Sequence, residues 1–382
     1  MIPYGRQHIT EEDIEEVVKV LKSDFLTQGP SILKFENEFA KYFGTTYAVA
    51  VNNGTAALHL SVLSLGVNSS SNVITTPITF AATANCVRYC GGEIYFADID
   101  PETYLLDIKK VRELLESHPK GFFDGIIPVD FAGRAVDMES FRQLADEFGC
   151  WIIEDACHAP GGFFEDSLGN KQLCGNNKHA DLTVFSFHPV KHIACGEGGM
   201  ITTNSHELYQ KLLMFRTHGI TKSPELLNEN HGGWYYEMQE LGYNYRLTDF
   251  QAALGSSQLK RANEGLIRRK EIANKYNDYF SNMTSILRHS GFIKGHAYHL
   301  YIIEVENRKE LYEYLKSKNI HCQVHYIPLH TFPYYREILK DKIELHYAEH
   351  YYQQCLSLPM YPSLTNSEQN YVIDQIKLFL NE

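Results

Sequence analysis

Short apolar runs alternate with amphipathic segments through the first two thirds of the chain. The apolar runs that predict buried strands are 47–52, 72–77, 93–99, 125–131, 150–155, 180–187 and 198–203. Helical spacing of apolar residues marks 12–23, 54–66, 80–92 and 138–149, with Thr10 and Asp13 as a capping pair for the first helix. This alternation predicts an α/β fold with a mostly parallel sheet and helices on both of its faces.

The pattern changes after about residue 250. A long amphipathic stretch over 250–281 predicts a linking helix. Strand-like runs at 296–307 and 321–326 then flank a helical segment at 309–319, before a terminal helix. We therefore expect a large domain over 1–252 and a smaller α+β domain over 253–382.

The charge and composition of the chain exclude several classes of function. A formal net charge of −12 leaves no basic surplus for phosphate backbones, which argues against nucleic-acid binding. No apolar run reaches the roughly 18 residues that a membrane span needs, and the polar, acidic start does not look like a signal peptide. The eight cysteines form no CxxC pair, so we expect a reduced, cytoplasmic protein without a metal site.

The segment NNGTAAL, residues 52–58, predicts a turn between a strand and a helix. Backbone N–H groups at a helix start bind phosphate, and the Thr55 hydroxyl adds a donor beside Gly54 and Ala56. An ordinary strand-to-helix turn has the same residues. The chain contains neither GxxxxGK[ST] nor GxGxxG, which argues against a nucleoside-triphosphate loop and a dinucleotide-binding loop.

The segment IIEDACHAPGG, residues 152–162, ends an apolar strand with Glu154 and Asp155. Ligands of open α/β sheets bind at the carboxyl ends of strands. A carboxylate there could pair with a protonated ring nitrogen, as in enzymes that use pyridoxal 5′-phosphate (PLP). His158 could lie beside such a ring or hold the carboxylate. A capping aspartate and a buried structural histidine would explain either residue taken alone.

The segment SFHPVKHIACGEGG, residues 186–199, places Lys191 between Ser186 and a glycine cluster. A lysine forms a Schiff base when an apolar surround or nearby positive charge keeps its amine neutral. Ser186 could bind phosphate, and the glycines allow close approach of the backbone. Lys191 alone could equally be a solvated charge. Together, the three segments supply phosphate donors, a ring-nitrogen carboxylate and an aldehyde-binding lysine, which predicts a PLP site.

Motifs along nearly the whole chain support this interpretation: NNGTAAL, TTPITFAATAN, IIEDACHA, SFHPVKHIACGEGG, FRTHG and GYNYRLTDFQAALG. In these motifs the chain resembles the fold-type I, PLP-dependent sugar aminotransferases of the DegT/StrS family. The pieces DFLTQGP, PVDFAGRAVDMES, AYHLY and CQVHYIPLH look most like the branch that aminates C4 of a UDP-linked 4-keto-6-deoxy hexosamine on the way to pseudaminic acid.

The resemblance implies a role for each matching residue. Lys191 matches the lysine that binds the cofactor and moves protons, Asp155 the carboxylate on the pyridine nitrogen, and His158 a polar neighbour of the ring. The other implied cofactor contacts are Gly54, Thr55, Ala56, Ser186, the stacking Phe80, and Asn244, which reaches the partner subunit's cofactor and so implies a homodimer. The implied substrate contacts are Tyr4, Asp24, Phe25, Leu26, Thr27, His325 and Tyr326.

The resemblance further implies transamination of a UDP-sugar with L-glutamate as amino donor and ping-pong kinetics. Some relatives carry histidine in place of the lysine and catalyse dehydrations, and this chain keeps Lys191. Three alternatives stay open: a dTDP- or GDP-linked keto-deoxy sugar as substrate, a non-catalytic PLP-binding regulator, and a desulfurase that would use Cys174 or Cys195. No role is predicted for Arg216, His218, Arg246, His188 or His192.

Overall fold

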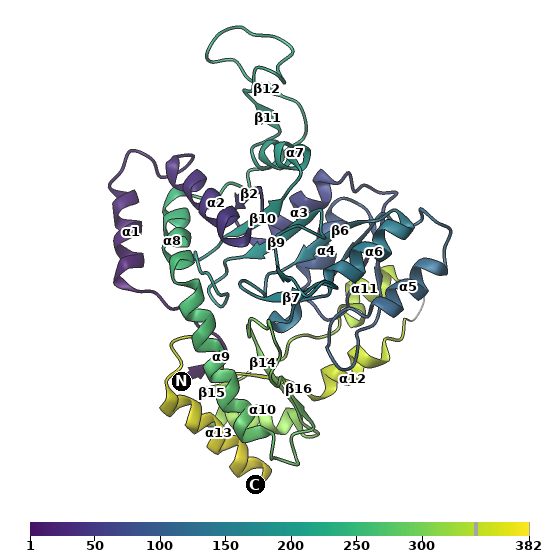
Figure 1. Ribbon diagram of the computed structural model, residues 1–382, viewed down its shortest axis with the longest axis vertical. Helices are drawn as coiled ribbons and strands as arrows, with labels where there is room; N and C mark the ends of the chain where they lie inside the picture. The colour runs from purple at the N-terminus through teal and green to yellow at the C-terminus, as the bar shows by residue number, and fades with distance from the viewer. Residues whose placement is uncertain (340–342, 382) are drawn as a thin grey trace.

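A seven-stranded sheet forms the centre of the computed structural model, which describes residues 1–339 and 343–381 (Figure 1). The strands lie in the order β2 (Tyr47–Val51), β10 (Gly199–Thr203), β9 (Leu182–Ser186), β6 (Trp151–Asp155), β5 (Gly125–Ile127), β3 (Asn72–Thr75) and β4 (Glu93–Phe96). The pairs from β9 to β4 are parallel, whereas β10 pairs antiparallel with both β9 and β2. The expectation of a mostly parallel sheet is confirmed.

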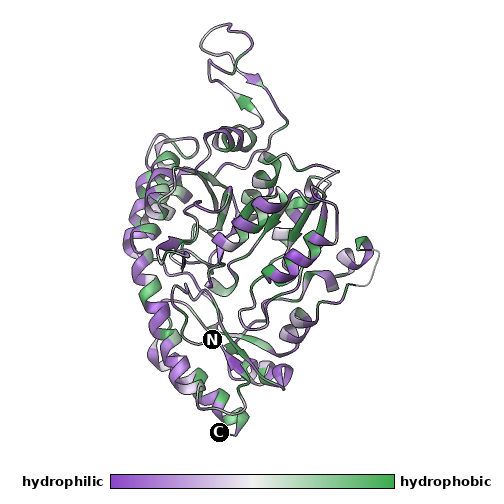
Figure 2. Cartoon of the chain, turned by 45° about the vertical axis from the view of Figure 1, so that its right-hand side comes forward, coloured by the Kyte–Doolittle hydropathy of each residue, from purple (hydrophilic) through white to green (hydrophobic). Residues whose placement is uncertain are grey.

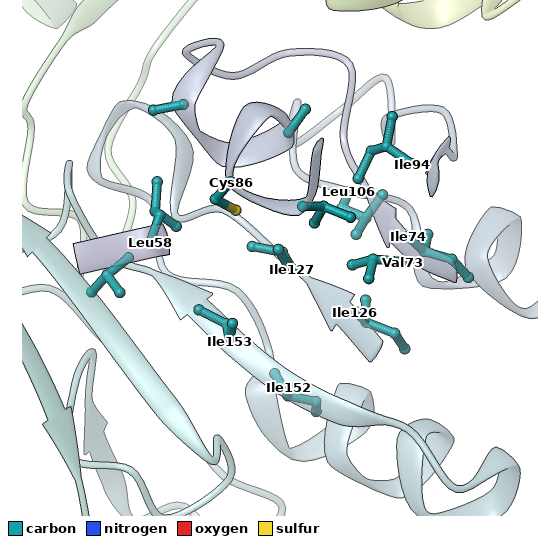
Figure 3. Packing of buried hydrophobic residues seen from close by; sticks show 14 of the residues in the cluster. Leu58, Val73, Ile74, Cys86, Ile94, Leu106, Ile126, Ile127, Ile152 and Ile153 are labelled. Atoms are coloured by element: carbon teal, nitrogen blue, oxygen red, sulfur yellow. The ribbon is translucent and has the colours of Figure 1, made fainter. Parts of the chain in front are cut away.

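Helices cover both faces of the sheet because successive strand residues point to opposite sides. On β2, Val49 and Val51 pack in one hydrophobic cluster with α3, while Ala48 and Ala50 pack in another with α2 and α8. Figure 3 shows how Ile74, Ile127 and Ile153 pack within the first cluster. The helices of this part of the chain are α1 (Glu11–Leu21), α2 (Pro30–Phe43), α3 (Gly54–Ser64), α4 (Ala82–Tyr89), α5 (Ile108–Glu116), α6 (Met138–Phe148), α7 (His206–Arg216) and α8 (Asp249–Lys260).

A smaller group of elements follows α8 and packs around its own hydrophobic cluster. It contains the sheet β13 (Arg288–His289), β14 (Tyr301–Glu304) and β16 (Cys355–Leu358), and the helices α9 (Ala262–Phe280), α10 (Arg308–Ser317), α11 (Pro333–Ile338), α12 (His346–Gln354) and α13 (Asn366–Leu380). The first strand of the chain, β1 (Ile2–Pro3), pairs with β15 (Ile320–His321), so the N-terminus lies beside this group (Figure 1). The division of the chain into two domains stays a prediction, and residue 252 lies inside α8.

Two expected elements were wrong. The linking helix over 250–281 is two helices, because Arg261, with φ −107° and ψ 12°, interrupts the helical backbone between α8 and α9. The strand over 321–326 is limited to Ile320–His321, and the residues after it line a cavity instead. Sequence analysis also missed α2, α5 and α7, whose apolar faces complete the cover of the sheet.

Two small hairpins lie outside the central sheet. The hairpin of β11 (Ile220–Thr221) and β12 (Glu237–Met238) projects beyond α7, at the top of Figure 1. The other joins β7 (Phe163–Glu165) to β8 (Lys171–Leu173). Figure 2 shows hydrophobic residues on the central strands and mixed hydropathy on the surrounding helices. Within residues 1–339 and 343–381, no helix is long and apolar enough to cross a membrane.

Candidate active site

A cavity of about 710 Å³ opens at the carboxyl ends of β6 and β9. Parallel strands that end at one edge of a sheet bring their last residues together, which places Asp155 and Ser186 in the same wall. Ten residues singled out by sequence analysis line the cavity: Tyr4, Gly54, Thr55, Phe80, Asp155, His158, Ser186, Lys191, His325 and Tyr326.

The carboxylate of Asp155 is buried in the cavity wall and held by two donors. The Thr83 hydroxyl donates to Oδ2 at 2.8 Å, and the backbone N–H of Cys157 donates to Oδ1 at 3.2 Å. No arginine or lysine forms an ion pair with Asp155 in the described part of the chain. The carboxylate is therefore fixed in orientation and still available to a cation in the cavity.

Lys191 lies in the loop between β9 and β10 and reaches the cavity half-buried. Its backbone N–H donates to the carbonyl of His188 at 2.8 Å, which closes a tight turn. Among the described residues, its side-chain amine has no hydrogen bond or ion pair. Burial lowers the pKa of Lys191, which favours the neutral, nucleophilic amine.

His158 connects the cavity wall to the C-terminal part of the chain. Its Nδ1 accepts the backbone N–H of Ala132 at 3.3 Å, so its proton lies on Nε2, 3.1 Å from the Tyr326 hydroxyl. Burial lowers the pKa of His158 well below its usual value, and the charge of Lys191 adds to this effect. The neutral imidazole of His158 is therefore oriented by the Ala132 N–H at Nδ1 and by the Tyr326 hydroxyl at Nε2.

The turn before α3 lies directly against the end of β9. A Cβ added at Gly54 would lie 3.0 Å from the Ser186 Cβ, and one at Gly199 would lie 2.5 Å from the Asn53 carbonyl oxygen. Both glycines therefore permit the close approach of the two segments. Thr55 and Ser186 supply hydroxyls there, whereas the N–H of Ala56 donates to the Asn53 side chain at 2.8 Å, and Ala56 does not line the cavity.

Aromatic side chains line the outer part of the cavity. Phe80 is 63% exposed, and its ring centroid lies 6.4 Å from that of Tyr326. Tyr4, carried next to strand β1, has its ring centroid 5.1 Å from that of His325. Because β1 pairs with β15, the first residues of the chain and the 323–326 segment form one side of the opening.

The remaining predicted site residues lie outside this cavity. Asn244 is exposed, in the segment that bridges to Thr217. The segment Asp24–Thr27 is also exposed and runs beside the start of α8, where Thr27 bridges to Thr248. Within one chain the structure does not bring either element to Lys191. Their predicted contacts with cofactor and substrate therefore stay predictions.

Sequence analysis missed several residues that line the cavity, including Thr79, Thr83, Cys157, Glu197 and Gln323. For Thr83 a signal existed, since it lies one helical turn after Thr79 and their hydroxyl oxygens are 2.8 Å apart. For Gln323 none existed, because its position depends on how the C-terminal elements pack. Cys174 and Cys195 are buried and do not line the cavity, so the structure gives the desulfurase alternative no support.

The structure also places residues that had no predicted role. Arg216 pairs with the Glu36 carboxylate at 2.5 Å and donates to the Ala50 carbonyl at 2.8 Å, so its visible contacts are structural. His192 points its Nε2 to the carbonyl of Ala297 at 2.9 Å. His188 lines the cavity at its exposed side.

A comparison with protein families decides between the chemistries that such a cavity allows. The model described as the DegT/DnrJ/EryC1/StrS aminotransferase family matches residues 7–377. The chain belongs to this family. Members of this aminotransferase family depend on PLP, and solved neighbours include PLP and PMP forms.

Individual relatives of this aminotransferase match over almost their whole length. The spore coat polysaccharide biosynthesis protein SpsC of Bacillus subtilis is 36% identical, with 98% of this chain and 96% of the relative covered. A UDP-4-amino-4,6-dideoxy-N-acetyl-beta-L-altrosamine transaminase of Campylobacter jejuni is also 36% identical, over 98% and 96%. The solved aminotransferase PseC of Helicobacter pylori, involved in pseudaminic acid biosynthesis, has a TM-score of 0.89 at 30% identity and covers 100% and 99%.

The cavity residues of this aminotransferase fit PLP. A fixed carboxylate without a protein cation suits a protonated pyridine nitrogen, and a half-buried lysine with a lowered pKa suits the aldehyde. The hydroxyls of Thr55 and Ser186, next to a helix start, suit the phosphate. These three groups converge on one cavity, which agrees with the cofactor that the family uses.

Proposed function

We propose that this aminotransferase transfers an amino group to C4 of a UDP-linked 4-keto-6-deoxy-N-acetylhexosamine, with L-glutamate as donor, in the biosynthesis of pseudaminic acid or a related surface glycan. The observation that carries the proposal is the convergence of Lys191, Asp155 and residues 53–55 on one cavity. The similarity to transaminases named for this class of sugar supports the substrate.

Lys191 holds the cofactor and moves protons. PLP, when bound, draws electrons from the carbon that carries the amino group, so that the proton on this carbon becomes acidic. The Lys191 amine, once displaced by the donor, takes this proton from the α-carbon of glutamate. In the second half-reaction the Lys191 ammonium returns a proton to C4 of the sugar, and the face on which it lies sets the stereochemistry.

The other residues of the cavity orient the cofactor. Asp155 keeps the ring nitrogen protonated, and its two donors fix the carboxylate in the required direction. The neutral His158 donates beside the ring, in a position held by Tyr326. Thr55, Ser186 and the N-terminus of α3 bind the phosphate.

The sugar nucleotide enters on the aromatic side of the cavity. Tyr4, His325 and Tyr326 contact it there, where aromatic rings stack on uracil or on the apolar face of a sugar. Asn244, which is exposed, reaches the cofactor of the partner subunit in a homodimer, and the exposed Asp24–Thr27 segment contacts the sugar nucleotide. The eight free cysteines agree with a cytoplasmic location.

A product assay tests the substrate. The purified protein is incubated with PLP, ¹⁵N-labelled glutamate and a UDP-linked 4-keto-6-deoxy-N-acetylhexosamine, and the sugar nucleotide is analysed by mass spectrometry. We expect ¹⁵N in the product at C4. Faster amination of a dTDP- or GDP-linked keto-deoxy sugar would refute the proposed nucleotide, and no amination of any keto sugar would favour the regulator alternative.

Substitution of the lysine tests the chemistry separately. Lys191→Ala removes the amine that binds the cofactor and carries the proton, so we expect product formation to fall by at least about 10³-fold. The far-ultraviolet circular dichroism spectrum is expected to stay unchanged, because Lys191 packs at a cavity and not in a hydrophobic cluster. Amination at the wild-type rate would show that Lys191 is not the catalytic residue.

A further inference from the structure

Tyr326 presents a hydroxyl group at the wall of the cavity. The residue is half-buried and lines the cavity. Its hydroxyl oxygen lies 3.1 Å from Nε2 of His158, and this hydroxyl has no other hydrogen-bond partner in the part of the chain that the structure describes. A tyrosine hydroxyl has one proton to donate and can also accept. The direction of the bond to His158 therefore decides what Tyr326 can offer to a ligand.

The other hydrogen bond of His158 fixes this direction. The Nδ1 atom of His158 accepts the backbone N–H of Ala132 at 3.3 Å, so Nδ1 carries no proton. A neutral imidazole has one N–H, which must then lie on Nε2 and donate to the Tyr326 oxygen. Tyr326 accepts this bond and keeps its own proton for another acceptor. Burial raises the pKa of Tyr326, so the hydroxyl stays protonated at neutral pH.

The imidazole of His158 has a fixed position behind Tyr326. It is 4% exposed, and its ring centroid lies 4.2 Å from that of His299. The segment of His299 is bound to the same backbone as His158, because the N–H of Leu300 donates to the carbonyl of Ala132 at 3.1 Å. The N–H of His158 is thus held toward Tyr326. The hydroxyl proton of Tyr326 points away from this donor and is available to a ligand in the cavity.

Three polar groups of PLP have partners in the proposed site. Asp155 binds the ring nitrogen, Lys191 binds the aldehyde, and the hydroxyls beside the start of α3 bind the phosphate. The fourth polar group is the oxygen on C3 of the ring, which is acidic and therefore accepts hydrogen bonds as an anion. His158 lines the same cavity, but its one N–H is engaged by Tyr326. The hydroxyl of Tyr326 is therefore the free donor of this pair.

The order of the strands places the C3 oxygen on the side of Tyr326. In the PLP ring, C3 and C5 lie on opposite sides of C4, so the oxygen and the phosphate flank the aldehyde from opposite directions. In the sheet, β6, which ends in Asp155, has β9 on one side and β5 on the other. Ser186, a phosphate donor, ends β9, whereas Ala132, which binds His158, follows β5. A ring held at Asp155 with its phosphate toward β9 therefore has its C3 oxygen toward His158 and Tyr326.

We propose that Tyr326 donates a hydrogen bond to the C3 oxygen of PLP, with its hydroxyl oriented by the N–H of His158. The inference rests on the proposed placement of PLP between Lys191, Asp155 and Ser186. A donor at the C3 oxygen stabilises the anionic form of this oxygen and fixes the rotation of the ring in the cavity. The 323–326 segment then contacts the cofactor as well as the sugar nucleotide.

A comparison of two ligands tests this hydrogen bond without a sugar substrate. The full-length protein, freed of cofactor, is titrated with PLP and with 3-deoxypyridoxal 5′-phosphate, and absorbance gives the affinity for each. The analogue lacks the C3 oxygen and keeps the aldehyde, the ring nitrogen and the phosphate. Tyr326→Phe removes the hydroxyl and keeps the ring. Tyr351→Phe is the matched control, because the Tyr351 hydroxyl is buried, donates to the carbonyl of His325 at 2.7 Å and does not line the cavity.

We expect Tyr326→Phe to weaken the affinity for PLP by about 10-fold or more, the effect of a lost hydrogen bond to a charged group. The affinity of this variant for the analogue should stay within about twofold of wild type, because the analogue has no oxygen to accept the bond. Tyr351→Phe should change both affinities by the same factor. Equal weakening of both ligands in Tyr326→Phe would overturn the proposal, and so would an unchanged affinity for PLP.

His158→Phe is a second variant, which keeps a ring beside His299 and removes the N–H that orients Tyr326. We expect a smaller preference for PLP over the analogue, and an undiminished preference would contradict the orienting role of His158. Failure of both variants to fold would reduce the pair to a structural role. Reduction of the wild-type complex with borohydride, followed by peptide mass spectrometry, tests the placement of PLP separately. A label on Lys191 supports this placement, whereas a label on another lysine would refute it.

Discussion

The buried carboxyl pair behind the cavity leads to a prediction about stability and pH. Asp130 and Glu154 are buried, and one oxygen of each lies within 4.8 Å of the other and of the Cys174 sulfur. Glu154 accepts from the N–H of Gly175 at 2.9 Å and from the Thr183 hydroxyl at 2.7 Å. No lysine, arginine or histidine pairs with either carboxyl in the described part of the chain. Two adjacent buried charges cannot both be kept, so the pair holds one proton.

The hydrogen bonds assign this proton to Asp130. Its Oδ1 accepts from the N–H of Val136 at 2.8 Å, whereas its Oδ2 has no hydrogen-bond partner among the described residues. Glu154, with two donors on one oxygen, is the better place for the negative charge. Burial and the charge of Glu154 raise the pKa of Asp130 well above its usual value.

The magnitude follows from proton linkage. In the unfolded chain Asp130 loses its proton near pH 4, whereas in the folded chain it keeps the proton to a much higher pH. A raised pKa stabilises the folded state fully below the unfolded value, and this stabilisation is lost as pH rises. Each pH unit in this window removes about 1.4 kcal/mol from the free energy of unfolding. Between about pH 6 and about pH 8, this one group therefore removes up to about 2.7 kcal/mol.

Asp130→Asn replaces the carboxyl group with a neutral amide that does not titrate. The amide keeps the acceptor for the Val136 N–H and offers a donor toward Glu154. Between about pH 6 and about pH 8, the free energy of unfolding of wild type should therefore fall by up to about 2.7 kcal/mol more than that of the variant. Guanidinium titrations of the cofactor-free wild type and variant, at one fixed protein concentration and in buffers with a chelator, measure the free energy of unfolding at each pH. Asp137→Asn, at the exposed cap of α6, is the matched control. If the advantage of Asp130→Asn over wild type is the same at both pH values, the pair does not share a proton.

Two further substitutions test the geometry of the cavity. Thr83→Val removes the hydroxyl that donates to Asp155 at 2.8 Å. Because hydrogen bonds to charged groups contribute about 1.5–3 kcal/mol, we expect the turnover rate to fall by about 10-fold or more, whereas Thr83→Ser should stay near wild type. Equal turnover rates in the two variants would contradict this role of Thr83. Gly199→Ala places a Cβ at 2.5 Å from the Asn53 carbonyl oxygen, so we expect the affinity for PLP, measured by absorbance titration, to weaken by about 10-fold. Gly233→Ala, where the added Cβ meets open space, should leave this affinity unchanged. An unchanged affinity in Gly199→Ala would show that the 52–55 turn does not bind the phosphate.

Much of the placement of the cavity residues follows from local sequence. Apolar runs bounded by turns specify β6 and β9, and the carboxyl ends of parallel strands share one edge of the sheet. For this reason Asp155 and Ser186, 31 positions apart, could be expected at one site. Lys191 follows five residues after Ser186, within reach of the same edge. Periodicity was less informative at Arg261, because a break of one residue leaves the amphipathic pattern of 250–281 intact.

Contacts between distant segments could not be predicted in this way. The bond from His158 to Tyr326 joins residues 168 positions apart, and the pairing of β1 with β15 brings Tyr4 to the opening from the other end of the chain. The buried Arg269 looks like any other basic position of an amphipathic helix, and only the packing of α9 against the 298–299 backbone removes it from water.

The sequence by itself determined the class of fold, the family and which strands end in candidate site residues. These features depend on hydrophobic periodicity and turn residues, which can be recognised within a few positions of the chain. The tertiary structure alone decided which charges are buried and which are paired. Among the described residues, Asp155 faces a cavity, Asp130 lies buried beside Glu154 without a cation, and Arg269 is buried without a carboxylate. These differences arise from desolvation and from the position of the nearest partner, and both depend on how elements far apart in the chain pack together.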